Sequence, residues 1–141
     1  MSKVFLDTNI FIYLIEDRGL WGKKAEALLE RLTLRKDDVY TSSLTLGEVL
    51  VKPLSLFDDR LAEAYERLLT SPGVHVVDFD KVAARCYASI RQDKSIKAPD
   101  AVQLAVAAAA RCDLFLTNDD RLSKKIVHGV QFIAGLDQSP I

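Results

Sequence analysis

Short apolar runs alternate along this chain with longer segments whose apolar residues recur at helical spacing, and this alternation constrains the fold more than any single motif. Strand followed by helix, repeated along a chain, is typical of a parallel sheet whose right-handed crossovers place helices on its faces. The sequence therefore predicts an α/β fold with a central parallel sheet of four to five strands flanked by helices. The runs expected to be strands are residues 4–6, 39–42, 74–79, 114–117 and 130–133.

One domain over residues 1–141 is the expectation from the length, because a chain of this size can bury a full hydrophobic core. Lysine and arginine number 19 against 20 acidic residues, so overall charge gives no argument for nucleic-acid binding. No stretch approaches the roughly 18 to 20 uninterrupted apolar residues of a membrane helix. Cys86 and Cys112 have no partner at CxxC or ligand spacing and are expected to be reduced thiols, which predicts a cytoplasmic protein.

Acidic residues stand at four points where an expected strand ends or an expected helix begins. Asp7 ends the first strand, and Glu48 begins the helix after the second strand. Asp100 opens a later helix, and Asp119 follows the fourth strand. Because the carboxyl ends of parallel strands gather at one edge of a sheet, we expect these carboxylates to converge. Oxygen donors expected to support them are Thr8, Asn9, Ser43, Thr117 and Asn118.

Each of these acidic residues also has an ordinary local explanation. Asp7 could be a turn or cap residue, and Thr45 with Glu48 matches a capping box at a helix start. Asp100 could compensate the dipole of its helix, and Asp119 could cap the helix that follows it. What favours a shared role is that all four occur at the same kind of position in the predicted sheet.

Electrostatics favours a bound cation if the four carboxylates do converge. Two carboxylates about 4 Å apart repel by about 4 kcal/mol at an effective dielectric near 20, and folds are stable by only about 5 to 15 kcal/mol. Oxygen ligands without histidine or cysteine suit Mg²⁺ or Mn²⁺, and such an ion suits phosphoryl chemistry. In the simplest division of roles, Asp7 and Asp100 hold the metal, and Glu48 or Asp119 orients the attacking water.

Four sequence blocks, in order, resemble the motifs of PIN domains and, more narrowly, of VapC-type toxin ribonucleases. They are Leu6-Asp7-Thr8-Asn9, the serine-to-glutamate block 42–50, the Asp-Ala helix 100–107 and the Thr-x-Asp block 115–119. Each block is weak alone, but four in order over most of the chain form a strong signal. Two positions depart from the pattern: Gln103 stands where the family often has histidine, and Asp120 doubles the last acidic residue. Asp119 is favoured at the site because it alone fits the Thr-x-Asp spacing.

The resemblance implies a Mg²⁺- or Mn²⁺-dependent endoribonuclease that cleaves RNA, single-stranded or structured. It also implies a homodimer and a small antitoxin partner, as in a type II toxin-antitoxin pair. The acidic residues Asp7, Glu48, Asp100 and Asp119 would then be both the metal ligands and the catalytic residues.

Two other functions compete with this interpretation. A phosphohydrolase of the haloacid dehalogenase type also carries an aspartate after its first strand, but it needs a second one two residues later, where this chain has Asn9. A PIN-like module that only binds RNA or protein would be marked by loss of acidic positions, and all four are present. Basic residues along the helix 20–34 could also form a track that binds phosphates, although charged residues on such a helix usually only face solvent. They are Lys23, Lys24, Arg31, Arg35 and Lys36.

Overall fold

The structure, a computed structural model, describes residues 1–141. Its centre is one sheet of five strands, all parallel, in the order β3-β2-β1-β4-β5. The predicted parallel sheet is therefore confirmed. The strands are β1 (Lys3–Leu6), β2 (Asp38–Ser42), β3 (Val74–Val77), β4 (Leu114–Thr117) and β5 (Phe132–Gly135).

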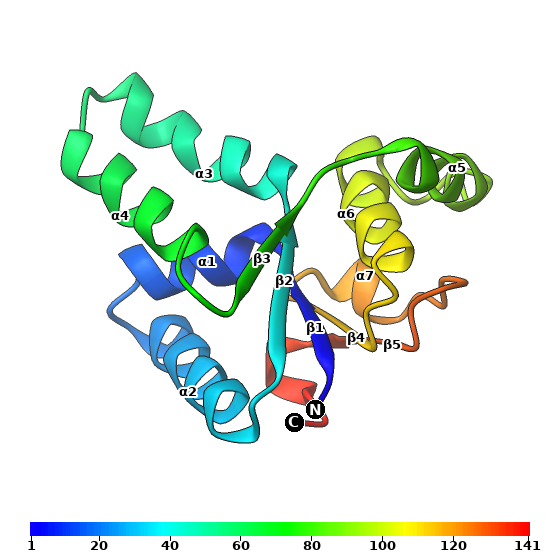
Figure 1. Cartoon of the computed structure of the whole chain (residues 1–141), viewed down its shortest axis with the longest axis horizontal. Helices are drawn as coiled ribbons and strands as arrows, with labels where there is room; N and C mark the ends of the chain where they lie inside the picture. Colours follow the sequence, from blue (N-terminus) through cyan, green and yellow to red (C-terminus); the bar gives the residue numbers. More distant parts are fainter.

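Helices lie on both sides of this sheet, with the first four in chain order on one side and the next three on the other (Figure 1). None of the helices combines the length and the apolar character that a membrane-spanning helix needs. The first group is α1 (Thr8–Glu16), α2 (Leu20–Arg35), α3 (Ser43–Ser55) and α4 (Asp59–Leu69). The second group is α5 (Lys81–Ile90), α6 (Ala98–Ala109) and α7 (Asp120–Ser123), and a 3₁₀ helix, η1 (Leu136–Gln138), follows β5.

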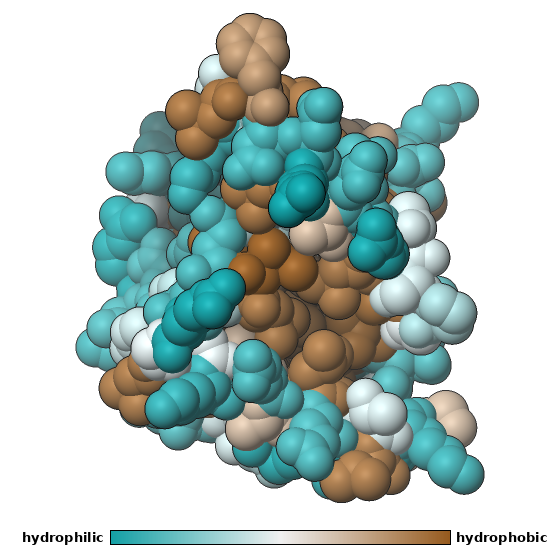
Figure 2. Space-filling model, turned by 90° about the vertical axis from the view of Figure 1, so that its left-hand side faces the viewer, coloured by the Kyte–Doolittle hydropathy of each residue, from teal (hydrophilic) through white to brown (hydrophobic).

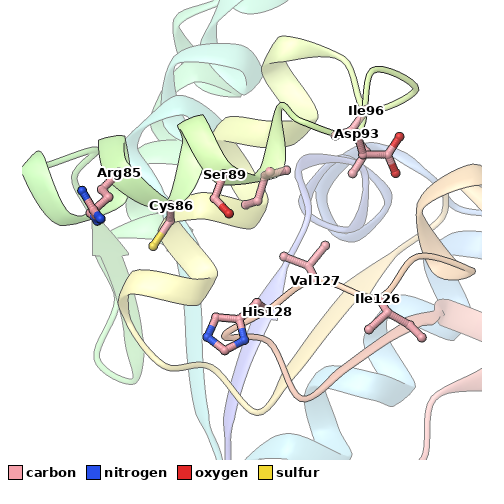
Figure 3. A pocket seen from close by; sticks show the side chains of 9 residues that line it. Arg85, Cys86, Ser89, Asp93, Ile96, Ile126, Val127 and His128 are labelled. Atoms are coloured by element: carbon pink, nitrogen blue, oxygen red, sulfur yellow. The ribbon is translucent and has the colours of Figure 1, made fainter.

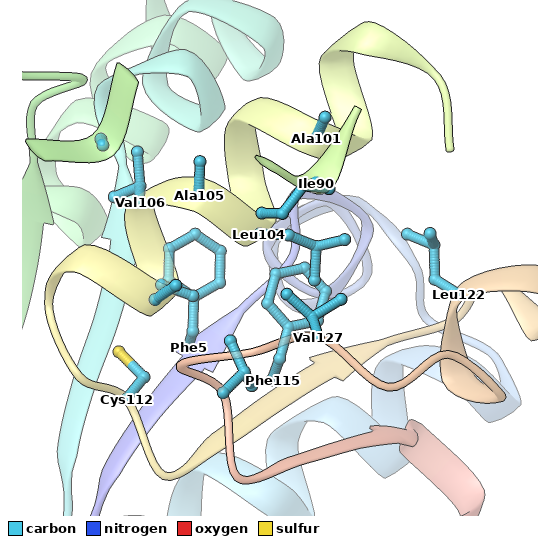
Figure 4. Close-up of a cluster of buried hydrophobic side chains, with 14 of the residues drawn as sticks. Phe5, Ile90, Ala101, Leu104, Ala105, Val106, Cys112, Phe115, Leu122 and Val127 are labelled. Carbon is cyan, nitrogen blue, oxygen red and sulfur yellow. The ribbon is translucent and has the colours of Figure 1, made fainter. Parts of the chain in front are cut away.

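Alternate side chains of each strand enter two separate hydrophobic cores, as the two-residue period of a strand requires. In β1, Phe5 belongs to the core beneath α5 and α6, whereas Val4 and Leu6 belong to the core beneath α1 and α2. Phe5 stacks on Phe115 of β4 with ring centroids 5.0 Å apart (Figure 4). Leu6 is paired with Leu116 across the two strands, so the chain leaves both strands at the same edge of the sheet.

The strand order places a ligand-binding position beside β1. The chain runs from β1 outward to β2 and β3, then returns to build β4 and β5 on the other side. Open α/β sheets bind ligands at the carboxyl ends of the two strands where the order reverses. Asp7 follows β1 directly, and Asp119 follows β4 after one intervening residue.

β1 and β2 each begin one residue earlier than expected, and two other strands differ from their expected bounds by two residues. The last strand was expected over residues 130–133, but β5 spans Phe132–Gly135. Val130 is buried in the core beneath α6 and donates its N–H to the Val127 carbonyl in a turn, so its apolar character reflects burial of a loop. The third strand ends at Val77, two residues earlier than expected.

Candidate active site

Asp7 leaves the end of β1 and caps the first turn of α1. The Thr8 N–H donates to Asp7 Oδ1 at 2.8 Å, and Thr117 Oγ1 on β4 donates to Oδ2 at 2.8 Å. Only 8% of the residue is exposed. Burial raises the pKa of Asp7 to about 6; the two hydrogen bonds oppose this shift, and the charges of Asp100 and Glu48 add to it. Asp7 is therefore held rigidly in a place where its negative charge is destabilised.

The four acidic residues singled out in the sequence line one pocket of about 280 Å³ at the carboxyl edge of the sheet. They come from the ends of β1 and β4 and from helices α3 and α6, so four separate parts of the chain contribute. No lysine, arginine, histidine or cysteine is among the lining residues, which are Asp7, Thr8, Asn9, Ile12, Glu48, Pro99, Asp100, Gln103 and Asp119. The predicted gathering of carboxylates at this edge is thus observed.

Glu48 lies in the second turn of α3 and not in a capping box with Thr45, as one local explanation had it. The helix begins earlier, at Ser43, because Ser42 is the N-cap and its hydroxyl accepts from the Thr45 N–H at 3.2 Å. Glu48 Oε1 instead accepts a hydrogen bond of 2.7 Å from the Thr8 hydroxyl. The carboxylate is therefore free of the helix start and is oriented by α1.

Gln103 is the residue whose importance the sequence did not reveal. Its side chain is almost fully buried, and its amide nitrogen donates to Thr45 Oγ1 at 2.8 Å and to Thr8 Oγ1 at 3.1 Å. The same nitrogen lies 3.4 Å from Glu48 Oε1, and the amide oxygen accepts from the Ser42 hydroxyl. Gln103 thus ties α1, α3 and α6 together beneath the pocket. Its position three residues after Asp100, on the same face of α6, is the signal that could have identified it.

Replacing Gln103 by leucine should reduce the free energy of unfolding by about 1 to 3 kcal/mol, because the buried hydroxyls of Ser42 and Thr45 would lose a partner. Urea unfolding of the purified protein measures this change. The control is Gln92→Leu, at an exposed position in the turn after α5, which should change stability by less than about 0.5 kcal/mol. Equal effects of the two substitutions would contradict the bridging role of Gln103.

Asp100 and Asp119 face the pocket in different electrostatic states. Asp100 lies in the first turn of α6, and burial, followed by the charge of Asp119, raises its pKa. Asp119 caps α7, and its Oδ2 accepts from Arg121 Nη2 at 2.9 Å while its Oδ1 lies 3.2 Å from Arg121 Nε. The Arg121 side chain holds the pKa of Asp119 below its usual value. Asp120 is exposed and lines a different hollow, so Asp119 is the one that faces the pocket.

Of the five residues expected to support the carboxylates, three are at the site. Thr8 and Asn9 line the pocket, and Thr117 holds Asp7. Two are placed elsewhere: Asn118 donates to the Tyr13 hydroxyl at 2.7 Å, away from the pocket, and Ser43 is not among the lining residues. The serine hydroxyl that joins the network is that of Ser42, because the helix starts one residue after it.

A second hollow, of about 350 Å³, lies between α5 and the loop at residues 126–128 (Figure 3). Its walls are largely apolar, and its only acidic residue, Asp93, accepts a hydrogen bond of 3.1 Å from Lys125. Cys86 and His128 also line it, but neither has a hydrogen-bond partner there. The hollow therefore lacks the converging carboxylates of the pocket at the sheet edge.

The family model of the PIN domain matches residues 4–126, which includes all four acidic residues. The chain belongs to the PIN domain family. With this assignment, the alternative of a haloacid dehalogenase fold is excluded. A sequence search of curated proteins gave no match.

Solved structures of toxin-antitoxin proteins share the fold of this PIN domain. VapBC from Salmonella typhimurium, bound to DNA, is 25% identical with a TM-score of 0.73, covering 96% of this chain and 99% of that one. VapBC2 from Rickettsia felis, bound to a DNA fragment from its promoter, has a TM-score of 0.76 at 17% identity. The match covers 94% of this chain and 98% of that one. VapC20 from Mycobacterium tuberculosis, a toxin that cleaves the sarcin-ricin loop, has a TM-score of 0.62 at 21% identity, covering 79% and 86%.

The donor set of the pocket suits a hard divalent cation, because every charged lining group is a carboxylate. In the conformation described, no group of three acidic, histidine or cysteine side chains is arranged to hold one ion. Two of these side chains already have protein partners, Glu48 with Thr8 and Asp119 with Arg121. The residues thus fit such an ion in chemistry and location, and an ion that bound Asp119 would have to displace Arg121.

Proposed function

We propose that this PIN domain is a Mg²⁺- or Mn²⁺-dependent endoribonuclease that hydrolyses phosphodiester bonds in single-stranded or structured RNA. The observation that carries the proposal is the pocket whose charged lining residues are Asp7, Glu48, Asp100 and Asp119, with no cationic side chain. Membership of the PIN family and the likeness to a toxin that cleaves an RNA loop support the same class of reaction.

The chain's own residues suggest a division of roles. Asp7 and Asp100, the two carboxylates whose pKa burial raises, would hold the ion, which when bound polarises the scissile phosphate and helps to ionise a water. Water is the expected nucleophile, because no cysteine, histidine or lysine lines the pocket. Glu48 is better placed than Asp119 to orient it. Glu48 engages only Oε1 with its neighbours, so Oε2 can accept a hydrogen bond, whereas Arg121 contacts both oxygens of Asp119.

The test is cleavage of labelled single-stranded RNAs, and of an RNA hairpin, by the purified protein with Mg²⁺, with Mn²⁺ and with EDTA. We expect cutting with either metal and none with EDTA. Absence of cutting with every RNA and both metals would contradict the nuclease proposal and would favour a binding module whose acidic residues only cap helices.

We further propose that a small antitoxin covers the side of the molecule formed by α1 to α4. Apolar side chains gather there in a hollow surrounded by hydrophilic residues (Figure 2). Large exposed apolar residues also cluster at the end of α3 and in the loop after it, namely Val51, Leu54, Leu56 and Phe57. Clustered exposed apolar surface marks interaction sites, and three of the solved neighbours are toxin-antitoxin complexes. Co-purification with the product of a short neighbouring reading frame would test this partner.

The resemblance to VapC-type toxins also predicts a homodimer. Sedimentation of the purified protein measures this state directly. A monomer at all concentrations would contradict the homodimer without affecting the nuclease proposal.

A further inference from the structure

The pocket at the sheet edge that is lined by the four carboxylates, called the acidic pocket below, adjoins another pocket of about 370 Å³. The two pockets share Asp100 and Asp119. The two pockets differ in the sign of their charge. The acidic pocket has four carboxylates and no cation, whereas its neighbour has three cationic side chains against the two shared carboxylates. The remaining residues that line the neighbouring pocket are Ser95, Arg121, Leu122, Lys124 and Lys125.

The three cations differ in how far protein partners already neutralise them. Lys124 is exposed and is in no ion pair. Lys125 bonds to Asp93 at 3.1 Å and to Ser95 Oγ at 2.6 Å, which fixes its loop against the turn between α5 and α6. Arg121 is paired with Asp119, although 68% of its side chain is exposed. Lys124 and Arg121 are therefore the cations available to an incoming anion.

The basic residues of α2, the other candidate phosphate track, are engaged differently. Lys24 is paired with Asp137, and Arg35 is paired with Asp37. Arg31 donates to the carbonyl of Ile141 at 3.2 Å. Three of the five basic residues of the candidate track are thus already bound by protein partners, and none of the five lines the acidic pocket or the pocket beside it. The pocket beside the carboxylates is therefore the better place for a phosphate.

We propose that the pocket lined by Arg121 and Lys124 binds the backbone phosphate of the RNA strand next to the cleaved bond, an inference that rests on the nuclease function proposed above. The planar guanidinium of arginine matches a phosphate as well as it matches a carboxylate. Arg121 therefore has two partners: Asp119 in the free protein and an RNA phosphate in the complex. It is a positioning residue, and the strand crosses from this pocket into the acidic one at the shared carboxylates.

Because Arg121 has these two partners, its removal should change the binding of RNA and the binding of a metal ion in opposite directions. Removing the guanidinium deprives RNA of a phosphate contact, but it also removes both guanidinium contacts from Asp119. Oδ2 is then free for a cation, while Oδ1 still accepts from the backbone N–H of residue 121. Arg121→Gln should therefore bind RNA more weakly and Mn²⁺ more tightly than the wild type. Lys124 is not bonded to a carboxylate, so Lys124→Gln should weaken RNA binding alone.

The experiment measures binding of a fluorescein-labelled single-stranded RNA in EDTA by anisotropy over a series of salt concentrations. We expect about tenfold weaker binding for Arg121→Gln and about threefold for Lys124→Gln, with a shallower salt dependence in each, since each loses about one phosphate contact. The matched control is Lys23→Gln on the exposed face of α2, which should bind as the wild type does. In a parallel titration without RNA, the concentration of Mn²⁺ that gives half the thermal shift should fall severalfold for Arg121→Gln only.

Several outcomes would overturn the inference. If Arg121→Gln and Lys124→Gln both bind RNA with wild-type affinity, the pocket is not a phosphate subsite. If Lys23→Gln weakens RNA binding equally, the effect comes from the overall positive charge and not from this pocket. Unchanged Mn²⁺ binding by Arg121→Gln would remove the exchange at Asp119. If the wild-type protein cleaves RNA and both variants bind RNA normally, the subsite is refuted and the nuclease proposal stands. If the wild-type protein neither binds nor cleaves RNA, both proposals are refuted.

Discussion

Asp7→Asn is expected to lower the rate of metal-dependent RNA cleavage by more than about a hundredfold. Loss of a group that only supports a metal ligand typically reduces affinity or activity by about 10- to 100-fold, and Asp7 is proposed as a ligand itself. The fold should persist, because an asparagine can still accept from the Thr8 N–H and bond to the Thr117 hydroxyl. Initial rates on a labelled RNA with Mn²⁺ measure the effect.

The matched control is Asp120→Asn, which neutralises a neighbouring acidic residue that does not line the acidic pocket. This variant should cut RNA at the wild-type rate. Mn²⁺ should raise the melting temperature of the wild type and of Asp120→Asn, but not that of Asp7→Asn. Cutting by Asp7→Asn at the wild-type rate would show that the metal assignment is wrong.

Asp7→Asn should also stabilise the metal-free protein, by an amount that depends on pH. The pKa of Asp7 rises from 3.8 to about 6 on folding, so the folded state holds this proton more tightly than the unfolded chain does. Ionisation therefore destabilises the fold progressively as the pH rises from about 4 to about 6. Above that range the full difference, about 3 kcal/mol from the size of the shift, opposes folding. Asparagine carries no charge and avoids this destabilisation.

Urea unfolding in EDTA at a series of pH values measures the difference between Asp7→Asn and the wild type. We expect the variant to gain about 3 kcal/mol above pH 7, and we expect the gain to disappear near pH 4. The matched control is again Asp120→Asn, whose carboxylate is exposed and lies outside the acidic pocket. A gain that is the same at pH 4 and pH 8 would mean that ionisation of Asp7 is not its source.

The sequence predicted the sheet and the gathering of the acidic residues because both depend on local patterns. The apolar run 114–117 forms a strand as expected, and Asp7 and Asp119 follow two strands that pair in parallel. The wrong boundary of the last strand has a physical cause. Val130 is apolar because it covers α6 from a loop, and a single sequence does not distinguish such burial from a strand.

The role of Gln103 could not be predicted because it depends on contacts between distant residues. Its partners Thr8, Ser42 and Thr45 lie 58 to 95 residues away along the chain. The pairing of Asp119 with Arg121 spans only two residues, yet the choice between a side-chain ion pair and a free carboxylate depends on rotamers that the sequence does not specify. Local chemistry thus identified which residues carry charge, and the tertiary structure determined which of them are restrained.

The pairing of β1 with β4 has a consequence for synthesis of the protein. β4, the neighbour of β1 on one side, and Asp119 with it leave the ribosome more than a hundred residues after β1. Domains fold as their chains emerge, so a growing chain that ends before β4 has no assembled acidic pocket. Whatever reaction the pocket performs is therefore withheld from a nascent chain until β4 and Asp119 have been made.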